Sequence, residues 1–430
     1  MQDQLELLYT TPAHVGKGND RCGAFTDNMR LPVHRWFRYS AGFSAEWAVS
    51  LLRESRLTSD RLVLDPFAGS GTALLAADQC CIPSVGIEAH PFVARIAKAK
   101  LLWGSDIDEF SRKANTVLRF ARSASCPIDG YPDLVRRCFQ PPALRSLSGL
   151  KEAWRKHEDG SPASELAWLA ITAVLRSASP VGTAQWQYIL PKKAKKTVVD
   201  PIEAFQAQVQ LMQTDMAFLQ RRNAATSAKV LQGDARDCPS VASSTVDWVI
   251  TSPPYPNNYD YADATRLEMS FWGEVQSWGD LHKAVRKNLI VSTSQHASIE
   301  HLTLEGILDS EQIAPIRGEV KEVCNRLGVE RLSHGGKKHY HTMIAAYFAD
   351  MARVWLELRR VCRPGAVVCF VAGDSAPYGI HVPVYKWLND LAVAAGFEQS
   401  HFEKLRDRNV KWRNRKHRVP LSEGILWVHG

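Results

Sequence analysis

Short apolar runs alternate with helical patterns in the first part of the chain. The apolar runs at 61–65 and 84–90 are typical of buried strands, and helical spacing follows each of them, at 73–81 and 91–103. Pro91 opens the second helical stretch, where its missing N–H leaves no hydrogen bond unmade. This strand–helix–strand–helix order predicts a parallel sheet with helices packed on its faces.

The alternation returns in the second half of the chain. Further strands are expected at 229–237, 246–255, 366–374 and 425–429, and helices at 347–365 and 382–397. Pro364 and Gly365 are expected to stop the first of these helices. The whole pattern predicts an α/β fold with a doubly wound, mostly parallel, Rossmann-like sheet.

Two insertions interrupt the expected sheet. Residues 1–103 contain an N-terminal segment, which turns helical after Ser44, and the first half of the sheet domain; residues 227–430 contain the second half. Between them, residues 104–226 form a large insertion, in which helices are expected at 165–178 and 201–222. A second insertion at about 256–345 is polar and rich in histidine, so we expect it to be loop-rich.

The composition is that of a folded, basic protein. Apolar residues make up 45% of the 430, and 53 lysines and arginines exceed 45 aspartates and glutamates, for a net charge of +8. This balance favours a polyanionic partner. The nine cysteines show no metal-ligand spacing, and the longest apolar run, 167–175, is shorter than the roughly 20 residues of a membrane span. We expect a soluble cytoplasmic protein with no metal and no membrane contact.

A glycine-containing turn, DPFAGSGT at 65–72, joins the first expected strand to the helix after it. Gly69 and Gly71 let the backbone approach a ligand closely, and the helix N-terminus offers free N–H groups. The turn is neither a GxGxxG nor a P-loop motif, since no lysine follows. Taken alone, it is more often a tight strand-to-helix turn than a binding site.

Two acidic residues change that interpretation. Glu88 ends the second strand, where an acid accepts both hydroxyls of a ribose, and Asp234 ends the third, where a carboxylate can accept from an adenine amino group. Asp65, in the turn, suits a cationic amino group better than a phosphate. Because parallel strands end at one edge of a sheet, these three acids predict a crevice for an adenosine carrying an amino acid.

A rigid turn follows the fourth expected strand. The sequence VITSPPY at 249–255 places two prolines directly after an apolar run. Proline removes a backbone donor and fixes φ, so the strand must stop there in a stiff, extended turn. We call residues 252–255 the ledge.

The combined motifs resemble the amino-group DNA methyltransferases that use S-adenosylmethionine. The resemblance lies in DPFAGSGT at 65–72, GIEAH at 86–90, GDARD at 233–237, TSPPY at 251–255 and RPGAVVCFVAGDS at 363–375. It implies S-adenosyl-L-methionine bound by Asp65, Phe67, Ala68, Gly69, Ser70, Gly71, Thr72, Glu88, Asp234 and Ala235, with Phe43 closing over the methionine end. It also implies a catalytic role for Ser252, Pro253, Pro254 and Tyr255.

The ledge fits the chemistry of that family. The Ser252 hydroxyl and the Pro253 carbonyl are placed to accept hydrogen bonds from an exocyclic amino group, and Tyr255 offers a face on which an extruded base can stack. In the family, serine before Pro-Pro-Tyr goes mostly with cytosine N4, and aspartate or asparagine mostly with adenine N6. The resemblance therefore implies a site-specific cytosine-N4 DNA methyltransferase of restriction–modification or phage defence.

Other functions stay open beside this one. An adenine-N6 enzyme would use the same site, and an RNA guanine-N2 methyltransferase pairs a similar loop with Pro-Pro-Tyr. Carbon-5 cytosine methylation is disfavoured because no cysteine here follows a proline, and a degenerate cofactor-binding subunit is disfavoured because every motif position is intact. Tyr259 and Tyr261 either line the base pocket or pack under the sheet.

Three basic stretches compete as contacts for double-stranded DNA. They lie at 186–197, 331–342 and 405–419, each with aromatic or histidine residues among its lysines and arginines. The insertion at 104–226 is a candidate for target recognition. A cognate restriction endonuclease would be the protein partner, and the sequence does not give the oligomeric state.

Overall fold

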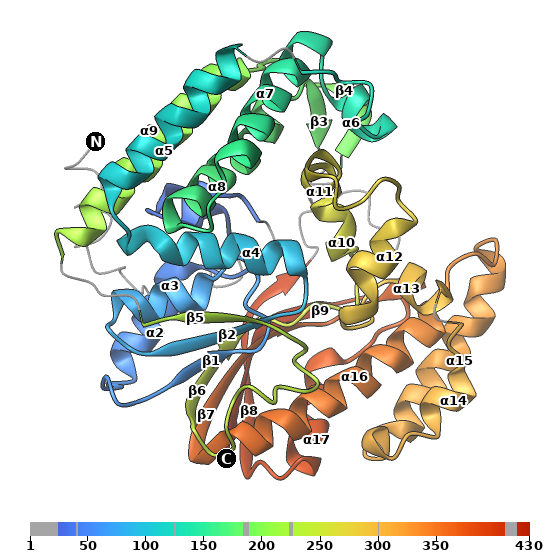
Figure 1. Ribbon diagram of the computed structural model, residues 1–430. Helices are drawn as coiled ribbons and strands as arrows, with labels where there is room; N and C mark the ends of the chain where they lie inside the picture. Colours follow the sequence, from blue (N-terminus) through green and yellow to red (C-terminus); the bar gives the residue numbers. More distant parts are fainter. Residues whose placement is uncertain are drawn as a thin grey trace.

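Seven strands form one twisted sheet at the centre of the molecule (Figure 1). The computed structural model describes residues 25–39, 42–123, 126–183, 189–222, 227–299, 301–408 and 419–430. The strands are β1 (Val63–Asp65), β2 (Ser84–Glu88), β5 (Lys229–Gln232), β6 (Val246–Thr251), β7 (Cys362–Gly373), β8 (Gln399–Arg408) and β9 (Leu421–His429). Their order across the sheet is β5-β2-β1-β6-β7-β9-β8.

Parallel pairing brings the ends of neighbouring strands to one edge. β5, β2, β1, β6 and β7 all run in the same direction, and β9 is antiparallel to its neighbours β7 and β8. This arrangement confirms the mostly parallel Rossmann-like sheet. Its carboxyl edge therefore collects the residues that follow each parallel strand.

Alternating side chains bury both faces of the sheet. On β1, Val63 packs with α2 (Ala45–Glu54) and α3 (Thr72–Gln79), whereas Leu64 packs on the opposite face with α16 (Tyr340–Val361) and α17 (Val384–Ala394). Ile250 and Val249 of β6 divide in the same way. Burial on both faces explains why these strands are nearly continuous apolar runs.

The helical insertion forms a layer beyond α4 (Pro91–Lys100), at the top of Figure 1. Its elements are α5 (Ile107–Ser123), α6 (Asp133–Cys138), α7 (Pro141–His157), α8 (Pro162–Ala178), a hairpin of β3 (Val181–Thr183) and β4 (Ile189–Ala194), and α9 (Pro201–Gln220). The expected helices at 165–178 and 201–222 correspond to α8 and α9. The hairpin was not expected.

Short helices fill the second insertion, on the right of Figure 1. They are α10 (Tyr261–Ala264), α11 (Arg266–Trp272), α12 (Asp280–Ala284), α13 (Ser294–Ile299), α14 (Leu304–Leu308) and the longer α15 (Arg317–Ser333). Two short 3-10 helices, Arg286–Asn288 and Glu311–Ile313, also lie in this insertion, and others are found at Phe25–Arg30, His34–Trp36, Leu101–Gly104 and Pro377–Gly379. The segment thus contains more regular structure than its lack of period suggested.

The stop signal after α16 acts differently from expectation. The helix ends at Val361, and Pro364 and Gly365 lie inside β7. On β6, Val246 pairs with Cys362 and Trp248 with Val367, so the residues between the two β7 partners bulge out of the ladder. Gly365 has a φ of 77°, which suits this bulge.

The helical insertion also holds the N-terminal segment. Asp215 of α9 is fully buried, and one of its carboxylate oxygens accepts from Val33 N at 3.0 Å and Trp36 Nε1 at 2.9 Å. The Arg35 guanidinium binds the same carboxylate through two nitrogens. On α4, the buried Lys100 ammonium donates to the carbonyls of His34 and Phe37.

No helix in the described part of the chain is long and apolar enough to cross a membrane.

Replacing Asp215 is expected to destabilise the protein. Asp215→Ala leaves a partly buried guanidinium and two buried N–H groups without their acceptor, so we expect a loss of about 3 kcal/mol in the free energy of unfolding, measured by urea denaturation. Gln206→Ala, at an exposed position of the same helix, is the matched control and is expected to change it by less than about 0.5 kcal/mol. Equal stability of the two variants would contradict this account of the N-terminal segment.

Candidate functional site

The acids expected at the strand ends line one edge of the sheet. Asp65 is the last residue of β1 and Glu88 the last of β2, while Asp234 follows β5 by two residues. The ledge begins at Ser252, directly after the end of β6. Since β5, β2, β1 and β6 are neighbours in this order, the three acids and the ledge follow one another along the carboxyl edge.

Glu88 ties the glycine turn to the second strand. Its Oε2 accepts from Gly69 N and its Oε1 from His90 N, each at 2.7 Å. A backbone bond from Ala68 N to Ile87 O, at 2.9 Å, runs beside them. Burial raises the pKa of Glu88 to about 7, although the two backbone donors oppose that shift.

The turn lies unusually close to β2. A Cβ on Gly86 would come within 2.7 Å of Ala68 Cβ and 2.8 Å of Leu74 Cδ1, so no larger residue fits there without moving the turn. Gly69 and Gly71 have φ values of 52° and 89°, the left-handed conformation that glycine adopts without strain. The glycines therefore set the shape of the turn and its distance from the strand.

Asp65 joins the first strand to the strand before the ledge. Its Oδ1 accepts from the Thr251 hydroxyl at 2.6 Å and from Phe67 N at 3.0 Å. The side chain is 1% exposed, and burial raises its pKa to about 7. Among the described residues, no lysine, arginine or histidine forms an ion pair with Asp65 or Glu88. The edge thus contains two buried carboxylates to which the described residues supply no cation.

Asp234 differs from these two because it is already paired. Both of its oxygens accept from the Arg236 guanidinium, at 2.6–3.0 Å, and Oδ1 also accepts from Arg236 N at 2.9 Å. The guanidinium of Arg236 also donates a hydrogen bond to the carboxylate of Asp350 on α16, at 2.8 Å. A ligand at Asp234 would therefore share its oxygens with this arginine.

The other residues expected to bind a cofactor are mostly buried around the turn. Ala68, Ser70, Thr72 and Ala235 are between 4% and 5% exposed, and Phe67 is half-buried. Phe43 is 3% exposed and packs edge-on against Trp47, with ring centroids 5.6 Å apart. Its role over the methionine end stays a prediction.

The ledge contacts an arginine of the basic stretch 405–419, which the sequence offered as a DNA contact and not as a neighbour of the ledge. Burial raises the pKa of Tyr255 far above its usual value, although the neighbouring Ser252 side chain opposes that shift. The guanidinium of Arg408, from β8, lies 5.1 Å from the centre of the Tyr255 ring. A cation from β8 therefore lies over the aromatic ring at the end of the ledge.

Further tyrosines surround the ledge. Tyr255 N donates to the Tyr261 hydroxyl at 3.4 Å, and Tyr259 lies edge-on to Tyr261 at 4.6 Å. Tyr347 of α16 is fully buried, and its hydroxyl has no hydrogen-bond partner among the described residues. The helical spacing of α16 does not distinguish Tyr347 from an ordinary core aromatic, so no signal in the sequence could have identified it.

The basic stretches are only partly described. Residues 409–418, the most basic part of 405–419, lie outside the described residues, as do 186–188 at the start of 186–197. The stretch 331–342 is described and runs from the last residues of α15 to the first residues of α16. Across the described part of the chain, no group of three histidine, cysteine, aspartate or glutamate residues is arranged to hold a metal ion.

Comparison with known proteins gives relatives that span most of the chain. No family model matches it. The chain is 25% identical over 434 residues to "Type II methyltransferase M.BsoBI" of Geobacillus stearothermophilus, covering 91% of this chain and 83% of that protein. It is also 25% identical over 411 residues to "Type II methyltransferase M.AvaI" of Nostoc sp., covering 87% and 81%. The similarity to these type II methyltransferases therefore extends over most of the chain.

Proposed function

We propose that this chain is a DNA methyltransferase that transfers a methyl group from S-adenosylmethionine to the exocyclic N4 of cytosine in a specific duplex sequence. The observation that carries the proposal is the row of buried carboxylates, Asp65 and Glu88, beside the ledge on adjoining strand ends. The names of the relatives support DNA methylation in a restriction–modification system. A cognate endonuclease as the partner is part of the proposal.

The crevice residues suit a positively charged nucleoside. S-adenosylmethionine supplies a reactive methyl group on a cationic sulfur. Glu88 would accept from the ribose hydroxyls, and the ionised Asp65 would pair with the ammonium of the amino acid end. Asp234 and Ala235 would meet the adenine, with Arg236 holding the carboxylate in place. This assignment provides a cation for Asp65 and two further donors for Glu88, neither of which pairs with a cation in the described part of the chain.

The ledge would prepare the amino nitrogen for transfer. Ser252 and the Pro253 carbonyl accept its two N–H groups, which favours a nitrogen whose lone pair is aimed at the methyl carbon. S-adenosylmethionine would supply the methyl group, and the amino proton lost in the transfer would pass to solvent. The fixed prolines keep both acceptors in position, so little reorganisation is needed in the transition state.

Tyr255 would hold the base itself. A base in a duplex must be extruded before its amino group can reach the ledge, and an aromatic face stabilises the extruded ring. Arg408 covers one face of Tyr255, so the base would use the opposite one. Serine before the prolines favours cytosine N4 over adenine N6, and the identity of the methylated nucleoside in the product decides between the two.

Cofactor affinity is expected to fall below pH 7. Burial raises the pKa of Asp65 and of Glu88 to about 7, so each acid is protonated in the free protein at lower pH and must lose its proton to bind a cation or two hydroxyls. Between pH 7.5 and 5.5 we expect the dissociation constant for S-adenosylmethionine to rise at least roughly tenfold. Isothermal titration calorimetry in two buffers of different ionisation enthalpy measures both the affinity and the protons released.

Asp65→Asn is the control for this pH effect. The amide keeps an oxygen for Thr251 and Phe67 N but cannot ionise. We expect weaker binding at pH 7.5, a shallower pH dependence and fewer protons released than in the wild type. A wild-type affinity that does not change between the two pH values would contradict the assignment of the crevice.

The product is expected to be N4-methylcytosine, and its formation is expected to depend on Ser252. Digestion of treated plasmid DNA to nucleosides, followed by mass spectrometry, identifies the methylated base. Ser252→Ala removes a hydrogen bond that matters chiefly in the transition state, so we expect the methylation rate to fall roughly tenfold to a hundredfold while cofactor and DNA affinities change little.

Ser50→Ala on α2, away from the carboxyl edge, is the matched control and should be fully active. N6-methyladenine as the sole product would overturn the choice of base and leave the ledge standing. A fully active Ser252→Ala enzyme would remove the role given to the ledge.

A further inference from the structure

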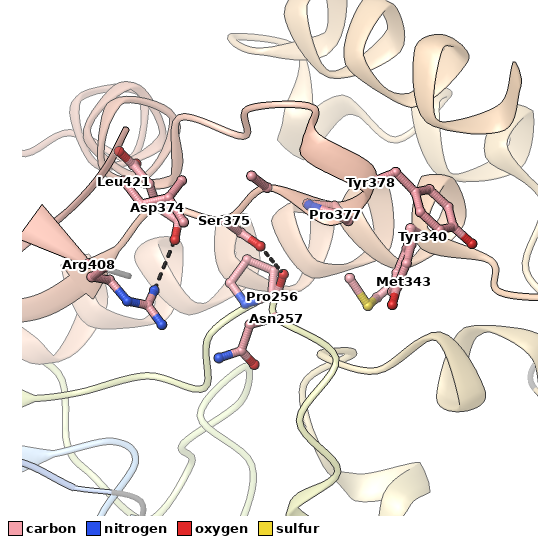
Figure 2. Close-up of a pocket in the computed structure, with 11 residues that line it drawn as sticks. Pro256, Asn257, Tyr340, Met343, Asp374, Ser375, Pro377, Tyr378, Arg408 and Leu421 are labelled. Atoms are coloured by element: carbon pink, nitrogen blue, oxygen red, sulfur yellow. Dashed lines mark hydrogen bonds between the residues drawn. The ribbon is translucent and has the colours of Figure 1, made fainter. Parts of the chain in front are cut away.

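A cavity of about 280 Å³ opens next to the ledge (Figure 2). Because β7, β9 and β8 lie on the other side of β6 from β1, β2 and β5, the cavity is on the side away from the three acids. Its lining comes from four places: Pro256 and Asn257 after the ledge, the turn after β7, the end of β8 with the start of β9, and the start of α16. Asp65, Glu88 and Asp234 are not among the lining residues. The cavity is therefore separate from the crevice proposed for the cofactor.

The cavity and the ledge share a wall. Ser375, after β7, donates from its hydroxyl to the Pro256 carbonyl at 2.7 Å. Arg408 donates to the Asp374 carbonyl at 2.9 Å, while its guanidinium covers Tyr255. Figure 2 shows Arg408 and Asp374 on one side of Pro256 and Asn257, with Tyr340 and Met343 on the other. Arg408 thus lines the cavity and also contacts the ledge.

Aromatic rings form the opposite wall. Tyr340 and Tyr378 meet edge to face at 4.8 Å, and the His334 ring stacks on Tyr378 at 4.2 Å with only 7° between the planes. Tyr378 has a φ of 53°, a left-handed conformation that a bulky residue adopts only where its surroundings impose it. The surrounding structure thus holds the ring at the cavity against backbone strain.

Positive charge lies at the rim of this wall. The Lys338 ammonium is 3.2 Å from the Tyr340 hydroxyl and lies over the same ring. Lys337 and Lys338 are both exposed and follow Gly335 and Gly336, which have φ values of 77° and 72°. A flat aromatic wall, an amide from Asn257 and exposed lysines are the features with which proteins hold a base and its phosphate.

We propose that this cavity holds a nucleotide that flanks the extruded base, with Tyr378 as the stacking ring and Lys337 and Lys338 at the adjoining phosphate. The inference rests on the proposed function, because it places the occupant in the same DNA strand. It assigns the contact nearest the target base to the second insertion and the turn after β7, and not to the helical insertion at 104–226.

The test is DNA binding by the full-length chain, measured as fluorescence anisotropy with a labelled 30-base-pair duplex at several salt concentrations. Lys337→Gln with Lys338→Gln should weaken binding and reduce the slope of log K against log salt by ~0.9 for each phosphate that the protein no longer neutralises. Tyr378→Leu keeps an apolar side chain but no ring, and should weaken binding roughly fivefold to a hundredfold, as expected when one base stack is removed.

Arg53→Gln with Lys229→Gln is the matched control, because it removes the same charge from exposed positions at the amino edge of the sheet. This variant should keep the wild-type slope. An unchanged slope for the Lys337/Lys338 variant would overturn the proposal, and that variant also decides the matter if Tyr378→Leu does not fold. A wild type that binds DNA but makes no methylated base would instead remove the proposed function, so the two failures are distinguishable.

A second measurement asks whether a flanking base occupies the cavity. Duplexes carrying an abasic site on either side of the methylated cytosine remove the base that would stack on Tyr378. On one of them, Tyr378→Leu should bind as well as the wild type, because the stack is already absent. A full additional loss of affinity on both duplexes would overturn the flanking nucleotide as the occupant.

Discussion

Two buried carboxylates hold the carboxyl edge of the sheet together. Asp65 receives the hydroxyl of Thr251 from the neighbouring strand, and Glu88 receives the N–H of Gly69 from the turn, so three strand ends and the glycine turn are fixed relative to one another. Removing a carboxylate from water is costly, and the pKa of each acid, raised to about 7, reflects that cost. An edge built for stability alone would not need either acid.

Much of this edge could be predicted from the sequence because it depends on local patterns. Strands buried on both faces are apolar runs, which located β1, β2 and β6, and parallel order alone brings the residues after them together. Gly69, Glu88 and Ser252 were therefore expected where they lie. The geometry supports the chemical roles proposed for these residues through the hydrogen-bond donors and acceptors that it brings together at the edge.

The parts that could not be predicted depend on contacts between distant segments. β8 is a mostly polar strand, so its sequence lacks the apolar period that identified its neighbours. Arg408 contacts Tyr255 because of the place of β8 in the sheet order, and Asp215 binds Arg35, which lies 180 residues away in the sequence. No pattern in either segment indicates its partner.

The two insertions are joined to each other as well as to the sheet. Arg176 of α8 binds the buried carboxylate of Glu268 of α11, and the Trp272 indole donates to the Thr172 hydroxyl at 2.9 Å. The segment that follows the ledge is thus anchored in the core of the helical insertion. A rigid position for the ledge depends on this packing as much as on the two prolines.

The anchoring of the N-terminal segment on Asp215 has a consequence for how such a chain can diverge. A helical insertion whose only task was to read DNA could be exchanged between relatives as a cassette. Here the same insertion supplies the acceptor for Val33, Arg35 and Trp36, and so completes the wall of the domain into which it is inserted. Any recombination that replaced α9 would also have to replace residues 33–36, and the two segments are expected to be inherited together.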